Sequence, residues 1–73
     1  MAIVMIDRAE TLEEVVTIAM EYQTSDKPVK VSLSPYDFKV IYNDYLDATG
    51  EKIKVGKPYG IGPVDIIFSK RRE

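Results

Sequence analysis

The amino-acid sequence predicts a small α+β domain with the element order β-α-β-α-β-β, in which two helices pack on one face of a mixed sheet that ends in a β-hairpin. Two segments have amphipathic helical spacing next to capping residues, and four short segments are apolar or alternate apolar with polar residues. The chain of 73 residues has room for one domain. We place that domain at residues 1–69 and a charged tail at 70–73.

The first strand is predicted at residues 2–6, where the five residues "AIVMI" are all apolar. A short continuous apolar run is typical of a strand that is buried on both faces. A helical start is the alternative, because alanine and methionine also favour helices. If the strand forms, a right-handed crossover places it parallel to the second strand.

The first helix is predicted within "DRAETLEEVVTIAMEY", residues 7–22. Two capping boxes overlap at its start, one from Asp7 to Glu10 and one from Thr11 to Glu14. Pro28 is expected to end the helix by keeping the preceding residue out of helical conformation. Helical spacing places five apolar residues in one stripe facing the core, namely Leu12, Val15, Val16, Ala19 and Met20.

A strand and a second helix are predicted next along the chain. Residues 29–33, "VKVSL", alternate between apolar and polar residues, as in a half-buried strand. Ser34 then has the position of an N-cap, Pro35 that of the first helical residue, and Gly50 that of the left-handed end. The predicted apolar face contains Phe38, Ile41, Tyr42 and Tyr45, and the predicted solvent side contains Asp37, Asp44 and Asp47.

The last two strands are predicted at residues 51–55 and 64–70, where the alternation returns. Residues 56–63 between them contain three glycines and two prolines, so we expect an irregular hairpin connection. The G-x-G motif in this loop is a weak phosphate-binding signal, because a strand and not a helix follows it. Within the loop, Tyr59 and Ile61 are expected to be exposed contact residues.

Catalysis and cofactor binding are not expected. The chain has no histidine and no cysteine, which removes imidazole and thiolate metal ligands and the usual base for activating a serine. No calcium-binding loop motif is present. We therefore predict a protein that is not an enzyme and that uses no cofactor and no metal.

The first functional hypothesis is a small protein-interaction or assembly protein of the phage or mobile-element accessory type. A domain of this size has a thin core, and without disulfides or metals it is expected to gain stability by self-association. The charge is also segregated, with nine acids and four bases in residues 1–50 but three acids and six bases in residues 51–73. The candidate contact residues are Tyr36, Val40, Tyr59, Ile61 and Ile67.

Two alternative functions remain open. The first is a nucleic-acid-binding module that uses the basic C-terminal residues, Lys52, Lys54, Lys57, Lys70, Arg71 and Arg72. The isoelectric point of about 5.1 weighs against it, because nucleic-acid binders tend to be basic. The second is an acidic inhibitor of a DNA-processing enzyme, in which carboxylates on the helices imitate a phosphate backbone.

The cellular location is predicted from the apolar start of the chain. That run is far shorter than the roughly 20 residues of a membrane span. It also lacks the basic start and long apolar core of a signal peptide. We therefore expect a cytoplasmic protein that does not contact membranes, in the host cytoplasm if a phage encodes it.

Overall fold

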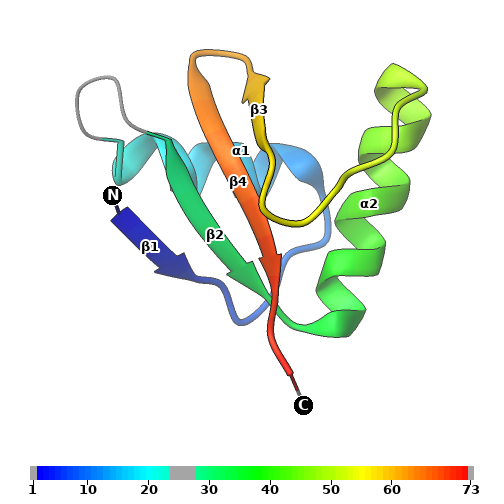
Figure 1. The fold of residues 1–73 in the computed structure, drawn as a ribbon, viewed down its shortest axis with the longest axis horizontal. Helices are drawn as coiled ribbons and strands as arrows, with labels where there is room; N and C mark the ends of the chain where they lie inside the picture. The colour runs from blue at the N-terminus through cyan, green and yellow to red at the C-terminus, as the bar shows by residue number, and fades with distance from the viewer. Residues whose placement is uncertain (1, 24–27, 73) are drawn as a thin grey trace.

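The computed structural model describes residues 2–23 and 28–72, and it confirms the predicted fold class and element order (Figure 1). Both helices pack against the central strands of a mixed four-stranded sheet. The elements are β1 (Ala2–Met5), α1 (Leu12–Glu21), β2 (Val29–Leu33), α2 (Pro35–Thr49), β3 (Pro58–Ile61) and β4 (Val64–Lys70).

The strands lie in the order β1-β2-β4-β3. β2 runs parallel to both β1 and β4, whereas β3 and β4 form the predicted antiparallel pair. The core lies between the two central strands and the helices. Its fully buried strand residues are Val29, Val31, Leu33, Val64, Ile66 and Phe68.

The prediction that the first strand is buried on both faces is wrong. β1 lies at an edge of the sheet, where Val4 is buried toward the helices but Ile3 and Met5 are 64% and 66% exposed. The strand is apolar along its whole length, so it has none of the alternation that usually marks a half-exposed strand. Its apolar residues therefore cover the edge of the core and leave two large side chains in solvent.

α1 begins at one of the two predicted capping boxes. The Thr11 hydroxyl accepts a hydrogen bond from the Glu14 amide at 3.2 Å, so Thr11 is the N-cap. The prediction that a capping box at Asp7 and Glu10 also starts the helix is wrong, because both residues precede it. Instead, the Glu10 amide donates to the Glu14 carboxylate at 3.3 Å.

The apolar stripe of α1 is mostly as predicted. Val15 and Ala19 are buried, but Met20, expected to face the core, is exposed. Ile18 packs against the core although the prediction omitted it. The helix ends at Glu21, and the predicted effect of Pro28 on Lys27 lies outside the described residues.

α2 has both predicted ends. The Ser34 hydroxyl accepts from the Asp37 amide at 3.1 Å, and Pro35 is the first helical residue. Gly50 ends the helix with φ at 77°, the left-handed conformation that glycine adopts without strain. Ile41 and Tyr45 are buried, as predicted.

Two aspartates of α2 do not lie on the solvent side, so that part of the prediction is wrong. Asp37 is only 6% exposed. The Asp44 carboxylate accepts from the Leu12 amide at 2.7 Å, a contact that is partly buried and joins the start of α1 to α2. Free amides at a helix start need acceptors, and here the neighbouring helix supplies one. Charged residues at helical spacing do not reveal such a contact.

Removal of the α2 cap gives a first testable prediction. Ser34→Ala is expected to lower the free energy of unfolding by about 1 kcal/mol, because the Asp37 amide loses its side-chain acceptor. Ser34→Thr, which keeps a hydroxyl, serves as the matched control and is expected to retain most of that stability. Urea unfolding followed by circular dichroism measures both, and an unchanged midpoint for Ser34→Ala would contradict the capping role.

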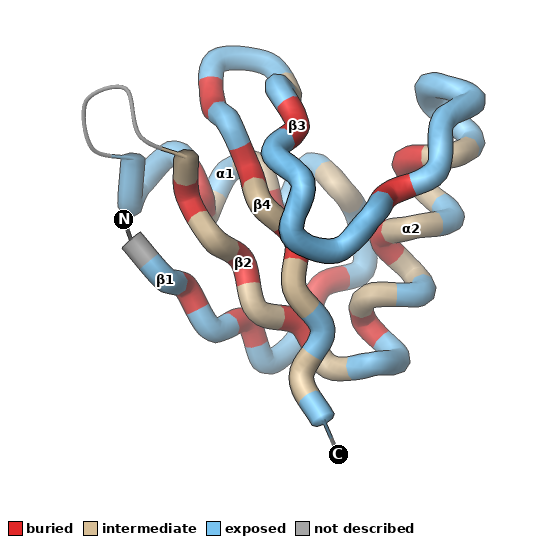
Figure 2. The backbone as a smooth tube through the Cα atoms, in the orientation of Figure 1, coloured by how far each residue is buried: buried red, intermediate tan, exposed pale blue. Residues whose placement is uncertain are grey.

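The prediction of a third strand at residues 51–55 is wrong. That segment has no strand pairing, and it is exposed except at Ile53 (Figure 2). β3 instead lies inside the predicted glycine loop and reaches β4 through the two-residue turn Gly62–Pro63. Short turns are the favoured hairpin connections, and Gly62 supplies the positive φ of 60°. Pairing with β4 therefore determines which segment forms the strand, although residues 51–55 alternate more clearly between apolar and polar side chains.

Within residues 2–23 and 28–72, no helix has the length and apolar character needed to cross a membrane.

Candidate protein-interaction surface

The two edges of the sheet differ in how well they are protected. At the β3 edge, Pro58 has no backbone N–H to offer, and the strand is only four residues long. β1 is equally short, but its sequence "AIVM" contains no charge and no proline. Charged residues and prolines are the usual means by which proteins prevent pairing at an edge. The β1 edge therefore lacks the protection of the β3 edge.

The free backbone groups of β1 belong to the residues whose side chains are exposed. Just beyond the strand, the Ile6 amide donates to the Ser32 carbonyl of β2 at 3.0 Å. Backbone groups alternate in direction along a strand, so those of Ile3 and Met5 point away from β2. Among the described strands, none pairs with that side of β1.

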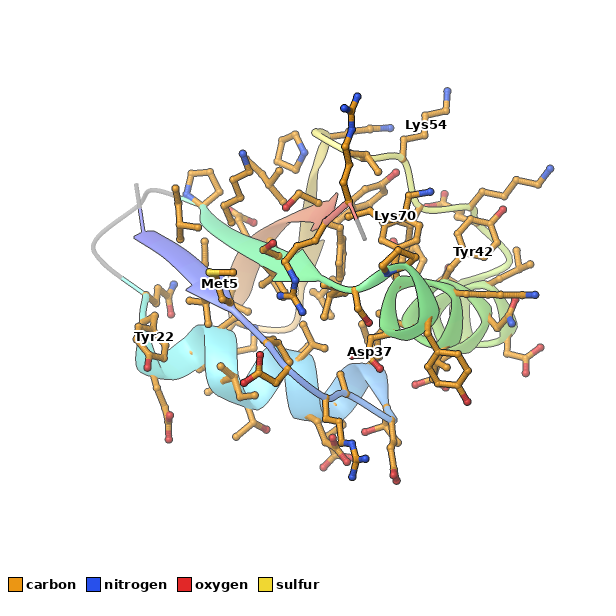
Figure 3. All side chains as sticks on the ribbon, turned by 90° about the horizontal axis from the view of Figure 1, so that it is seen from below. Met5, Tyr22, Asp37, Tyr42, Lys54 and Lys70 are labelled. Atoms are coloured by element: carbon orange, nitrogen blue, oxygen red, sulfur yellow. The ribbon has the colours of Figure 1, made fainter. Side chains whose placement is uncertain are left out.

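The sheet face opposite the helices is the second part of this surface, and we call it the open face. Ile3, Lys30 and Ile67 occupy one row across it, because each is the register partner of the next. Lys30 and Ile67 are half-buried. Figure 3 shows α1 on one side of the sheet, and it shows Met5 on β1, the outermost strand of the sheet. Lys30 separates the two isoleucines of this row, so the exposed apolar surface at this edge is made by Ile3 and Met5.

The structure separates the predicted contact residues. Ile67 lies on the open face, whereas Tyr36 and Val40 line a hollow beside the start of α2. Tyr36 is 76% exposed. Ile61 is half-buried and packs against the core. These residues do not form one patch, and the most exposed part of the β1 edge, Ile3 and Met5, was not among them.

The expectation that Tyr59 is exposed is wrong, because it is only 8% exposed. Its ring lies 5.6 Å from that of Tyr45 and 6.1 Å from that of Phe68, measured between centroids. Its hydroxyl accepts from the Lys54 amide at 2.7 Å and donates to the Lys52 carbonyl at 3.2 Å. Tyr59 therefore holds the segment before β3 against the core and offers no free ring to a partner.

The predicted basic residues fall into two groups, at 52–57 and 70–72. Lys57 Nζ lies 5.4 Å from the ring centroid of Tyr59, and Lys70 Nζ lies 5.7 Å from that of Phe38. Arg71 donates from Nη1 to the Ser32 carbonyl at 2.9 Å. Tyr59 is the aromatic residue beside Lys57 in the first of these groups. Because its ring is buried, it cannot stack on a base in this structure.

A hollow lies between the first turn of α2 and the segment that joins β1 to α1, with a volume of about 610 Å³. It is lined by Asp7, Arg8, Ala9, Glu10, Ser34, Tyr36, Asp37 and Val40. In the part of the chain that the structure describes, no three metal-ligating side chains come close enough to hold a metal ion.

Comparison with protein-family models, with curated proteins and with solved structures gives no match for this chain. Any functional proposal therefore depends on the physical properties of its own surface.

Proposed function

We propose that the protein is a non-catalytic interaction module that self-associates through the edge of β1 and the adjoining open face. One observation carries the proposal: Ile3 and Met5 are about two-thirds exposed on a strand edge that has neither charge nor proline. Unprotected edges of this kind are templates for pairing with another strand.

A second copy of the chain fits this edge by symmetry. Two β1 strands related by a twofold axis run antiparallel, and their pairing joins two four-stranded sheets into one continuous sheet. In the register centred on Val4, Ile3 lies opposite the partner's Met5. Both residues direct their backbone groups toward the edge, so the pair exchanges hydrogen bonds. The exposed side chains of both copies then meet on the open face.

The strength of such a dimer depends on how much of the exposed apolar side chains it buries. Full burial of an isoleucine or methionine side chain contributes roughly 1.5–3 kcal/mol, and Ile3 and Met5 are partly covered already. Four side chains together therefore provide several kcal/mol, most of which offsets the lost freedom of the two copies. A weak dimer that depends on protein concentration is expected.

Sedimentation tests this proposal. The apparent mass of the wild-type chain is expected to rise above 8.3 kDa as its concentration increases from about 10 μM to about 1 mM. Met5→Lys and Ile3→Lys, each alone, are expected to weaken association at least about tenfold, because each places a charge at the edge.

Val55→Lys is the matched control, since Val55 is also an exposed apolar residue but lies on the segment before β3. This variant is expected to associate like the wild type. A wild-type chain that sediments as a monomer throughout, or lysine variants at β1 that associate normally, would show that the edge is not the interface.

A further inference from the structure

The hollow beside α2 contains a largely buried carboxylate, that of Asp37, to which no described residue donates a hydrogen bond. It lies at the carboxyl ends of the parallel strands β1 and β2, where the chain leaves the sheet to form each helix. Figure 3 shows Asp37 at the start of α2, facing the segment that leads to α1. Asp37 is 94% buried, since only 6% of it is exposed, and it lines the hollow.

The Asp37 side chain is unpartnered among the described residues. Its backbone amide donates to Ser34, but no described group donates to its carboxylate. In the described part of the chain, every side-chain oxygen that is fully shielded from solvent has a hydrogen-bond partner. Because the Asp37 carboxylate has no such partner, it is not fully shielded and can be reached from the hollow. A carboxylate offers about four acceptor positions, and buried ones are normally hydrogen-bonded. Donors from a ligand would satisfy it.

The charges around the hollow favour a cation. Asp7, Glu10 and Asp37 provide three carboxylates against the one guanidinium of Arg8, a net charge of −2. The positive end of the α2 dipole is equivalent to only about half a charge and does not reverse the sign. Because Asp37 is buried, its interaction with a cation is screened less than at an exposed site.

We propose that this hollow binds an arginine side chain of a partner protein. A guanidinium presents two parallel N–H groups to one carboxylate, which suits Asp37. The exposed Tyr36 ring at the rim offers a face for a cation–π contact. Ala9 and Val40 provide apolar wall for the aliphatic stem of the arginine. This site shares no residue with the β1 edge, so it does not depend on self-association.

Titration with N-acetyl-arginine-N-methylamide, followed by amide chemical shifts in NMR spectra, tests the site. Saturable shifts are expected at Ala9, Asp37 and Val40 at ligand concentrations up to about 100 mM, because one side chain binds weakly. The citrulline analogue is the matched control ligand, since it has nearly the same shape without the charge. It is expected to produce no saturable shift.

Four variants of the protein sharpen the test. Asp37→Asn is expected to weaken binding at least about tenfold, and Tyr36→Ala about threefold, whereas Tyr36→Phe keeps the ring and binds normally. Arg8→Ala is expected to strengthen binding, because it removes the cation that competes for the hollow. If Asp37→Asn fails to fold, the comparison of Tyr36→Ala with Tyr36→Phe still tests the site.

Three results would overturn the arginine site: no saturable shift, equal binding of the citrulline analogue, or unchanged affinity in both Asp37→Asn and Tyr36→Ala. The Met5→Lys variant separates this proposal from self-association. It is expected to bind the arginine compound like the wild type, although its self-association is weakened at least about tenfold.

Discussion

Phe68→Ala is expected to lower the free energy of unfolding by about 3–5 kcal/mol, the usual cost of removing a phenylalanine from a core. Phe68 is fully buried on β4, the strand that pairs with both β2 and β3. Domains have stabilities of roughly 0.05–0.15 kcal/mol per residue, so a chain of this size has about 4–11 kcal/mol in total. One substitution therefore removes a large share of the stability.

Guanidinium unfolding followed by circular dichroism measures this loss. Ile67→Ala is the matched control, because Ile67 is the neighbouring residue of β4 but lies half-buried on the open face. Ile67→Ala is expected to cost much less stability than Phe68→Ala, because Ile67 is only half-buried and its removal leaves a smaller cavity. Equal costs for the two variants would mean that the core is not on the helix side of β4.

Tyr59→Ala is expected to be nearly as damaging, at about 3–5 kcal/mol, judged from the cost of removing other aromatic core residues. The variant loses the ring contacts with Tyr45 and Phe68 and also the hydroxyl that holds the segment before β3. Tyr59 thus contributes to stability through its ring packing and through the two hydrogen bonds of its hydroxyl, whereas Phe68 contributes through packing alone. The two contributions of Tyr59 can be measured separately.

Tyr59→Phe isolates the hydroxyl, because it keeps the ring. Its expected cost is about 0.5–1.5 kcal/mol, the net value of a typical hydrogen bond. Amide exchange gives a second readout: the Lys54 amide, which donates to the hydroxyl at 2.7 Å, is expected to exchange faster in this variant. If Tyr59→Phe matched the wild type in both stability and Lys54 exchange, the hydroxyl would have no part in holding that segment.

The parts of the fold that the sequence predicts well depend on local chemistry. Thr11, Ser34 and Gly50 act on backbone groups only a few residues away, so their positions alone indicate where α1 and α2 begin or end. The alternation of β2 likewise follows from the burial of one face. Because these features act within a few residues, they do not depend on the order of the strands.

The parts that the sequence predicts poorly depend on contacts between distant residues. The alternation at residues 51–55 resembles a strand, but the chain pairs Pro58–Ile61 with β4 instead. An apolar run such as that of β1 does not show whether it lies at the centre or the edge of a sheet. For that reason, the exposure of Ile3 and Met5 was not foreseen.

The candidate sites show the same division. Tyr36 and Val40 stood out because they lie off the apolar stripe of α2, and both line the hollow. Asp37 was assigned to the solvent side together with Asp44 and Asp47, because the three aspartates lie off the predicted apolar face of α2. It lines the hollow together with the segment joining β1 to α1, which lies more than 25 positions earlier in the chain.

The position of β4 between β2 and β3 has a consequence for synthesis on the ribosome. β1, α1, β2 and α2 emerge first, yet the strand that completes the centre of their sheet comes from Val64–Lys70. The nascent polypeptide thus exposes the apolar side of β2 until that stretch has left the exit tunnel. The sheet is therefore completed only after Val64–Lys70 has been synthesised, and chaperones that recognise unfolded apolar segments have the preceding interval in which to bind.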